Sequence, residues 1–272
     1  MNIKLGKLTL KPGGELFIIA GPCVLEDDNV PLEIGRRMAE ACAELDLPYI
    51  FKASYDKANR TSNKSFRGPG IEKGIEQLLQ IRDKLGVPVL TDVHSVDDAL
   101  KAGAAIDVIQ IPAFLCRQTD LLEAAASTKA CVNVKKGQFL APWDAKNIVE
   151  KLKAFGAKTF MLTERGASFG YNTLVSDMRS IPIMKEFGCP VVFDATHSVQ
   201  SPGGMGETSG GDGKYAPVLA RAAVAAGCDG VFAETHIDPS KAKSDGPNMI
   251  PLADMPALLR QLKAIRRVVT TS

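Results

Sequence analysis

The chain has 272 residues, close to the roughly 250 residues of a typical (β/α)8 barrel. Its 33 basic and 31 acidic side chains are interspersed and leave a net charge of +2, which argues against a nucleic-acid or membrane partner. Six cysteines without a CxxC pair, no signal-peptide pattern and no apolar run of membrane-spanning length lead us to expect reduced thiols and a cytoplasmic protein.

The predicted elements begin with a short hairpin. Residues 3–10 alternate apolar and polar around Gly6-Lys7, so we assign residues 1–14 to an N-terminal β-hairpin extension that covers the bottom of a barrel. Short, almost continuously apolar runs follow, as is typical of parallel strands covered on both faces. These runs occupy residues 17–21, 49–53, 88–93, 107–112, 131–134, 159–163, 190–193 and 230–233.

Helical segments separate these runs. Apolar residues recur with helical period over 30–45, 71–85 and 252–265. Gly86, Gly156 and Gly227 each stand where a glycine commonly ends a helix. Because strand and helix alternate throughout and no linker divides the chain, we predict an α/β fold, a single TIM-barrel domain over 1–272. The glycine-rich stretch 201–214 is predicted to be a mobile loop over one barrel mouth.

Polar or reactive residues stand at the end of every predicted strand. In barrels of this kind the chemistry lies at the carboxyl ends of the strands. Solvation alone hardly explains a polar residue at all of them, so we predict an active site there. In chain order the set is Cys23, Lys52, Lys57, Asp92, His94, Gln110, Lys135, Arg165, Asp194, His197, Glu234 and His236.

The cations of this set indicate an anionic, phosphorylated substrate, because lysine and arginine are the usual partners of phosphate and carboxylate. Any one lysine alone is more often a solvated surface charge. Direct placement after an apolar strand favours a functional role for Lys135 and Arg165. The cations considered are Lys52, Lys57, Arg60, Arg67, Lys135 and Arg165.

Cys23, His197, Glu234 and Asp245 offer thiolate, imidazole and carboxylate donors suited to zinc, iron or manganese. They form no local motif, and Cys23 by itself is more often a buried core cysteine. A closed barrel makes the first, seventh and eighth strands neighbours, which would bring three of the four together. From the residues alone, the metal-binding and the structural interpretations both stay open.

Longer segments resemble a known family. IAGPC (19–23), FKASYDKANR (51–60), VNVKKGQF (132–139), TERG (163–166), FDATHS (193–198) and FAETH (232–236) are similar to the 3-deoxy-D-manno-octulosonate 8-phosphate synthases. The likeness runs from about residue 14 to 265, in order and without large gaps. It implies a homotetrameric TIM barrel of lipopolysaccharide precursor synthesis that condenses phosphoenolpyruvate with arabinose 5-phosphate and water, releasing phosphate.

The resemblance also implies roles for residues by position. Lys57, Lys135 and Arg165 would hold phosphoenolpyruvate, and Lys52 would also bind substrate. A loop containing Asn59, Arg60 and Thr61 would grip the sugar phosphate across a subunit boundary. The implied site lining is Asp92, His94 and Gln110, and the implied catalytic residues are Lys135, His197, Asp245 and Asp92.

The family has metal-requiring and metal-free branches, which carry cysteine and asparagine, respectively, at the position of Cys23. The resemblance therefore implies one divalent metal per subunit (iron, zinc, manganese or cobalt) on Cys23, His197, Glu234 and Asp245. Gly246-Pro247 departs from this pattern and resembles the metal-free branch. We hypothesise that the metal acts as template and Lewis acid without supplying the main part of the rate enhancement.

Three alternatives are weighed against this interpretation. A 3-deoxy-D-arabino-heptulosonate 7-phosphate synthase shares the barrel, but a Lys-Pro-Arg pattern replaces KANR (57–60). A Schiff-base aldolase would use Lys57 or Lys135 as nucleophile. A non-catalytic sugar-phosphate-binding barrel would have no physical need for the complete polar ring.

Overall fold

The structure is a computed structural model, and it describes all residues except 28, 60–64, 203–209 and 271–272. Its main sheet is a closed parallel barrel, because the last barrel strand pairs with both the first and the seventh. In barrel order the strands are β3 (Phe17–Gly21), β4 (Tyr49–Lys52), β5 (Val89–Asp92), β6 (Val108–Ile111), β7 (Cys131–Lys135), β8 (Phe160–Glu164), β11 (Val191–Asp194) and β14 (Gly230–His236). The predicted α/β TIM barrel is confirmed.

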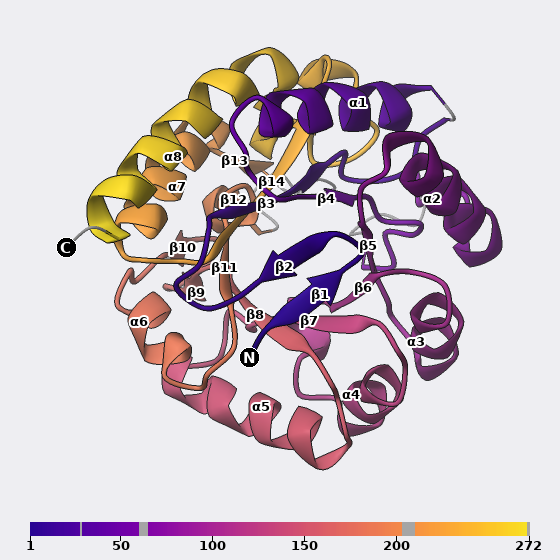
Figure 1. The fold of residues 1–272 in the computed structure, drawn as a ribbon, viewed down its shortest axis with the longest axis vertical. Coiled ribbons are helices and arrows are strands. Elements are labelled where there is room, and N and C mark those ends of the chain that lie inside the picture. The colour runs from indigo at the N-terminus through magenta and orange to yellow at the C-terminus, as the bar shows by residue number, and fades with distance from the viewer. Residues whose placement is uncertain (28, 60–64, 203–209, 271–272) are drawn as a thin grey trace.

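Helices form a ring outside the barrel (Figure 1). They are α1 (Val30–Ala43), α2 (Ile71–Leu85), α3 (Val96–Gly103), α4 (Thr119–Ala126), α5 (Ala145–Ala154), α6 (Ser180–Lys185), α7 (Ala216–Ala225) and α8 (Met255–Thr270). Local sequence sets several of their ends. Gly86 adopts the left-handed conformation and donates to Arg82 O at the end of α2, and the Ser95 side chain accepts from Asp98 N at the start of α3.

The N-terminal hairpin plugs the bottom of the barrel. Strands β1 (Ile3–Leu5) and β2 (Leu8–Leu10) pair antiparallel and lie across its axis in Figure 1. Ile3, Leu5 and Leu10 join one apolar cluster with the first inward-facing residues of the barrel strands, such as Phe17 and Met161. A second and larger cluster lies between the strands and the helices. The hairpin predicted for residues 3–10 is therefore confirmed, as is its position.

Shorter elements lie at the mouth of the barrel opposite the hairpin. They are β9 (Ala167–Ser168), β10 (Leu174–Val175), β12 (Gln200–Ser201), β13 (Gly210–Gly211), β15 (Ile250–Pro251) and the 3-10 turns η1 (Ala113–Leu115), η2 (Pro142–Asp144), η3 (His197–Val199), η4 (Gly213–Tyr215), η5 (Pro239–Lys241), η6 (Gly246–Asn248) and η7 (Leu252–Asp254). The described ends of the 201–214 loop pair as β12 and β13, and its middle lies outside the described residues. Within the described chain, no helix is long and apolar enough to span a bilayer.

Asp229 ties the hairpin to the barrel bottom. Its buried carboxylate accepts from Gly13 N at 2.7 Å, from Val191 N at 2.9 Å and from Lys185 Nζ at 3.0 Å. Arg266 of α8 reaches the same region and donates to Cys228 O at 3.2 Å. One carboxylate therefore fixes the hairpin exit, β11 and α6 together.

We expect Asp229→Asn to lower the free energy of unfolding by about 3 kcal/mol, because an amide oxygen cannot satisfy three donors and the charge of Lys185 loses its partner. Urea unfolding followed by circular dichroism measures this change. The matched variant Asp83→Asn removes an exposed carboxylate and should change stability by less than about 0.5 kcal/mol. Equal effects of the two substitutions would contradict the anchoring role.

Candidate active site

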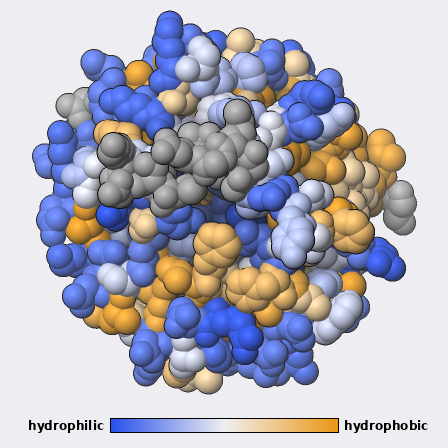
Figure 2. All heavy atoms as spheres, turned by 180° about the vertical axis from the view of Figure 1, so that it is seen from behind, coloured by the Kyte–Doolittle hydropathy of each residue, from blue (hydrophilic) through white to orange (hydrophobic). Residues whose placement is uncertain are grey.

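The alternation of each strand places the site residues in the barrel lumen. Ile50, Leu90 and Val192 point inward at the lower level, so the residues two positions later, Lys52, Asp92 and Asp194, point inward at the upper level. The lower level is apolar and buried, whereas the upper level is polar. Viewed from the mouth at the carboxyl ends of the strands, the molecule shows a hydrophilic hollow near its centre (Figure 2).

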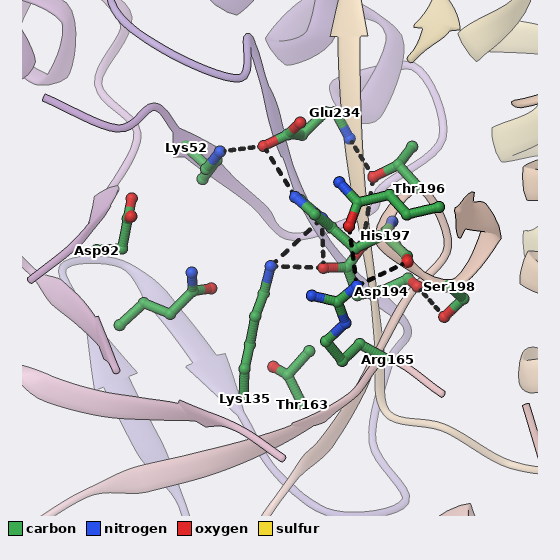
Figure 3. Close-up of polar contacts among 12 residues, drawn as sticks. Lys52, Asp92, Lys135, Thr163, Arg165, Asp194, Thr196, His197, Ser198 and Glu234 are labelled. Carbon is green, nitrogen blue, oxygen red and sulfur yellow. Dashed lines mark hydrogen bonds and ion pairs between the residues drawn. The ribbon is translucent and has the colours of Figure 1, made fainter. Parts of the chain in front are cut away.

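Asp194 is the buried anion of one half of the site. Its Oδ2 lies 2.5 Å from Lys135 Nζ and 2.7 Å from His197 Nδ1, so the three side chains form one contiguous cluster (Figure 3). Burial favours the neutral acid, but the charges of His197 and Lys135 outweigh it and hold the pKa of Asp194 far below its usual range. Burial, partly offset by Asp194, lowers the pKa of Lys135.

Glu234 is the matching anion of the other half. Its Oε1 lies 2.5 Å from Lys52 Nζ and 3.7 Å from Lys57 Nζ. Burial opposes ionisation of Glu234, yet Lys52, His197 and Lys57 hold its pKa well below the usual range. The pKa of Lys57 is raised because Cys23 and the neighbouring carboxylates outweigh the effect of its burial. Both lysines therefore lie beside a carboxylate that the protein itself supplies.

Arg165 enters the lumen from the end of β8. Oε1 of Glu164 accepts from the backbone N of Arg165 at 2.9 Å and of Gly166 at 2.6 Å, which fixes the turn. Nη2 of Arg165 donates to His197 O at 3.0 Å and to Gln200 Oε1 at 2.9 Å. Its buried Nε has no hydrogen-bond partner among the described residues. A buried guanidinium with a free donor is a ready partner for a carboxylate or phosphate.

Asp92 and His94 form a second ionisable pair. Nε2 of His94 lies 3.0 Å from Asp92 Oδ2, and the Ser54 hydroxyl donates to Asp92 Oδ1 at 2.5 Å. Burial lowers the pKa of His94, but Asp92 outweighs that effect and the net pKa is raised. Gln110 lies beside this pair in the strand order, since Asp92 and Gln110 are register partners.

Several site residues were not singled out from the sequence. Asn133 donates to Gln110 Oε1 at 3.3 Å and accepts from the Thr163 hydroxyl at 2.7 Å, completing the polar level. Asn133 and Thr163 each lie two positions after an inward apolar residue of their strand, so period-2 alternation was the signal that could have identified them. Gln200 lies in the two-residue strand β12 and Ser244 lies in a loop, and no local pattern marks either residue.

Three of the four predicted metal ligands converge. Cys23, Glu234 and Asp245 offer donor atoms that all lie within 4.8 Å of one another. His197 falls outside that set of three but is adjacent to it, with Nε2 3.6 Å from Glu234 Oε1 and 3.8 Å from Asp245 Oδ2. The bond between Nδ1 and Asp194 leaves Nε2 directed at the carboxylates, as a metal-binding histidine requires. The mixed sulfur, nitrogen and oxygen donors fit a borderline transition metal.

The local backbone explains how these ligands are held. A Cβ on Gly21 would lie 2.0 Å from Lys52 O, so only glycine lets β3 approach β4 just before Cys23. Cys23 Sγ lies 3.0 Å from Ser244 Oγ, and burial, followed by the charge of Glu234, raises the pKa of the thiol to about 12. Asp245 is left-handed, with φ 51°, and a Cβ on Gly246 would lie 2.3 Å from Pro239 O. Gly246 is thus required by packing.

Other predicted residues lie apart. Asn59 is exposed, and Arg60 and Thr61 lie outside the described residues. Arg67 forms an exposed ion pair with Asp56. His236, although it ends β14, directs Nδ1 to the Asp238 backbone, with 2.7 Å between Nδ1 and Asp238 O.

Known proteins are similar to this chain over almost its whole length. The model of the DAHP synthetase I family matches residues 4–271. The chain is 60% identical to a 2-dehydro-3-deoxyphosphooctonate aldolase of Aromatoleum aromaticum, over 93% of this chain and 91% of that protein. Proteins of the same name from Trichlorobacter lovleyi and Geobacter metallireducens are each 56% identical, over 98% of both chains. The chain therefore belongs to the DAHP synthetase I family, among the 2-dehydro-3-deoxyphosphooctonate aldolases.

Proposed function

We propose that this protein condenses phosphoenolpyruvate with D-arabinose 5-phosphate and water, forming 3-deoxy-D-manno-octulosonate 8-phosphate and inorganic phosphate for lipopolysaccharide precursors. The observation that carries the proposal is a cationic array directed into one lumen, made of buried Lys52, Lys135 and Arg165 and partly buried Lys57. Two multiply charged anions repel each other, and such an array offsets the repulsion. The relatives' name supports the same reaction class.

In the proposed reaction the methylene carbon of phosphoenolpyruvate bonds to the aldehyde carbon of the sugar. Water adds to the former enol carbon, and phosphate leaves by cleavage of the C–O bond. Arg165 and Lys135 bind the carboxylate and phosphate, since the Nε donor of Arg165 has no partner among the residues that the structure describes. The Asp92–His94 pair is our proposed proton source for the aldehyde oxygen, because Asp92 outweighs burial and raises the pKa of His94, which increases its protonated fraction.

We further propose one divalent metal per subunit, held by Cys23, Glu234, Asp245 and His197. When bound, it supplies Lewis acidity and a template for the aldehyde or a water. The chain's own contribution is to fix the His197 ring through Asp194 and to keep Cys23 beside Ser244. The packing constraint on Gly246 supports a structural reason for Gly246-Pro247 that is independent of metal use.

Self-association is proposed through an exposed aromatic face. Phe114, Phe139, Trp143, Phe169 and Tyr171 are each more than half exposed and follow β6, β7 and β8. Clustered exposed aromatic rings are typical of interaction surfaces. We propose that this aromatic face contributes to a homotetramer, as the family resemblance implies, in the cytoplasm, where the free, buried cysteines stay reduced.

The first experiment supplies phosphoenolpyruvate with either arabinose 5-phosphate or erythrose 4-phosphate and measures phosphate release. We expect turnover with the five-carbon sugar. Arg165→Lys should lower kcat/KM for phosphoenolpyruvate by about 10²-fold, because lysine keeps the charge but loses the planar fork. Arg179→Lys, at an exposed ion pair, is the matched control and should leave it unchanged. Preference for erythrose 4-phosphate would select the heptulosonate reaction, and borohydride trapping of substrate on lysine would select a Schiff base.

Metal removal tests the ligand set. We expect about one divalent ion per subunit by elemental analysis, and phosphate release that falls after chelation and returns with Mn²⁺. Cys23→Ala should reduce the bound metal well below one per subunit, whereas Cys42→Ala, at a buried cysteine between helix and barrel, should not. Full activity in chelated protein of proven low metal content would overturn the metal requirement while leaving the reaction intact.

The oligomer is tested by sedimentation velocity. Wild-type protein should sediment as a tetramer, and Phe169→Glu should shift the population towards smaller species, because a buried unpaired charge opposes association. Val218→Glu, at an exposed apolar position on α7, serves as the control. A monomeric wild type, or a tetramer insensitive to Phe169→Glu, would remove the aromatic face from the proposal.

A further inference from the structure

We infer that Gln200 is a positioning residue that couples the anion-binding half of the site to the metal-binding half, so that phosphoenolpyruvate and metal bind cooperatively. This inference rests on the proposed function and deepens it. Gln200 is not one of the proposed metal ligands, yet its side chain joins Arg165 in one half to Asp245 in the other.

The side chain of Gln200 bridges Arg165 and Asp245. Its Oε1 accepts from Arg165 Nη2 at 2.9 Å, and its Nε2 donates to Asp245 Oδ2 at 2.7 Å. A guanidinium can only donate and an ionised carboxylate can only accept, so the amide has one allowed orientation. Hydrogen bonds in such a chain polarise one another, so strengthening one end strengthens the other.

The backbone of Gln200 is held on both sides. Gln200 directly follows η3, the turn that begins with His197. It pairs with Gly211 across the β12–β13 hairpin. A Cβ on Gly211 would lie 1.7 Å from Oδ1 of Asn248, so this hairpin packs directly against the turn that follows Asp245. The amide is therefore anchored to the segments of both His197 and Asp245.

The two bridged residues each depend on this amide. Among the described residues, Gln200 is the hydrogen-bond donor to the Asp245 carboxylate, which adopts an unusual left-handed backbone. Nη2 of Arg165 donates to Gln200 Oε1 and to His197 O, so that Nε is available to bind an anion. An anion that fixes the guanidinium thus also fixes the amide and, through it, the carboxylate that faces Cys23 and Glu234.

Thermodynamic linkage makes this coupling measurable and reciprocal. If phosphoenolpyruvate tightens the binding of metal by some factor, metal must tighten the binding of phosphoenolpyruvate by the same factor. Couplings of this kind are commonly about 5- to 150-fold. We expect wild-type protein, stripped of metal and titrated with Mn²⁺, to bind the ion at least about fivefold more tightly when phosphoenolpyruvate is saturating.

The test compares two variants that keep the volume of Gln200. Gln200→Met removes both hydrogen bonds, and we expect the coupling to fall to within about twofold of none. Gln200→Glu can still accept from Arg165, but an ionised glutamate has no N–H to donate to Asp245. It too should therefore lose the coupling while retaining affinity for phosphoenolpyruvate. Gln118→Met, at an exposed glutamine before α4, is the control and should keep wild-type coupling.

The Kd of Mn²⁺ is measured by equilibrium dialysis, with and without phosphoenolpyruvate, and that of phosphoenolpyruvate by calorimetry, with and without Mn²⁺. Unchanged coupling in both Gln200 variants, or none in wild type, would overturn the inference even when wild type makes the eight-carbon product. Absence of product and of phosphoenolpyruvate binding in wild type would instead overturn the proposed function. Circular dichroism melts establish that each variant is folded.

Discussion

Two buried carboxylates, Asp194 and Glu234, hold the cations on which the rest of this site depends. Removing a lysine or arginine from water is costly unless an anion stands beside it. Asp194 lies within 2.7 Å of both Lys135 and His197, and Glu234 lies 2.5 Å from Lys52. These anions compensate the cations only in part, since within the described part of the chain Nε of Arg165 has no hydrogen-bond partner. A dianionic substrate can pair with the remaining positive charge.

The same two carboxylates also link the anion-binding and metal-binding halves. Glu234 faces Lys52 on one side and the donor group of Cys23 and Asp245 on the other. Asp194 neutralises Lys135 and at the same time directs the His197 ring. A residue that serves two partners cannot move for one without disturbing the other. The site is therefore a single electrostatic unit rather than two adjacent ones, and Gln200 adds a direct bridge.

The barrel suits this arrangement because its two ends have opposite character. At the lower end, Phe17, Ile19 and Met161 pack against the hairpin and exclude water. At the upper end, the inward residue two positions further along is polar on every barrel strand except β3, where it is Gly21. A dry floor lowers the local dielectric and strengthens every charge interaction above it. Stability resides at one end of the fold, and chemistry resides at the other.

The sequence by itself determined the barrel, the hairpin and most of the polar ring, because the period and the end of a strand are local features. Lys135 and Asp92, for example, are each recognised from the apolar run that directly precedes them. Asn133 and Thr163 were within reach of the same alternation. Only the tertiary structure decided that Cys23 meets Asp245, that His236 turns away, and that Gln200 joins Arg165 to Asp245. The Cys23–Asp245 and Gln200 contacts join segments far apart in the sequence, and no periodicity specifies the mutual positions of those segments. Closure of the barrel brings them together. The contact of His236 with Asp238 is local, but strand alternation does not predict it.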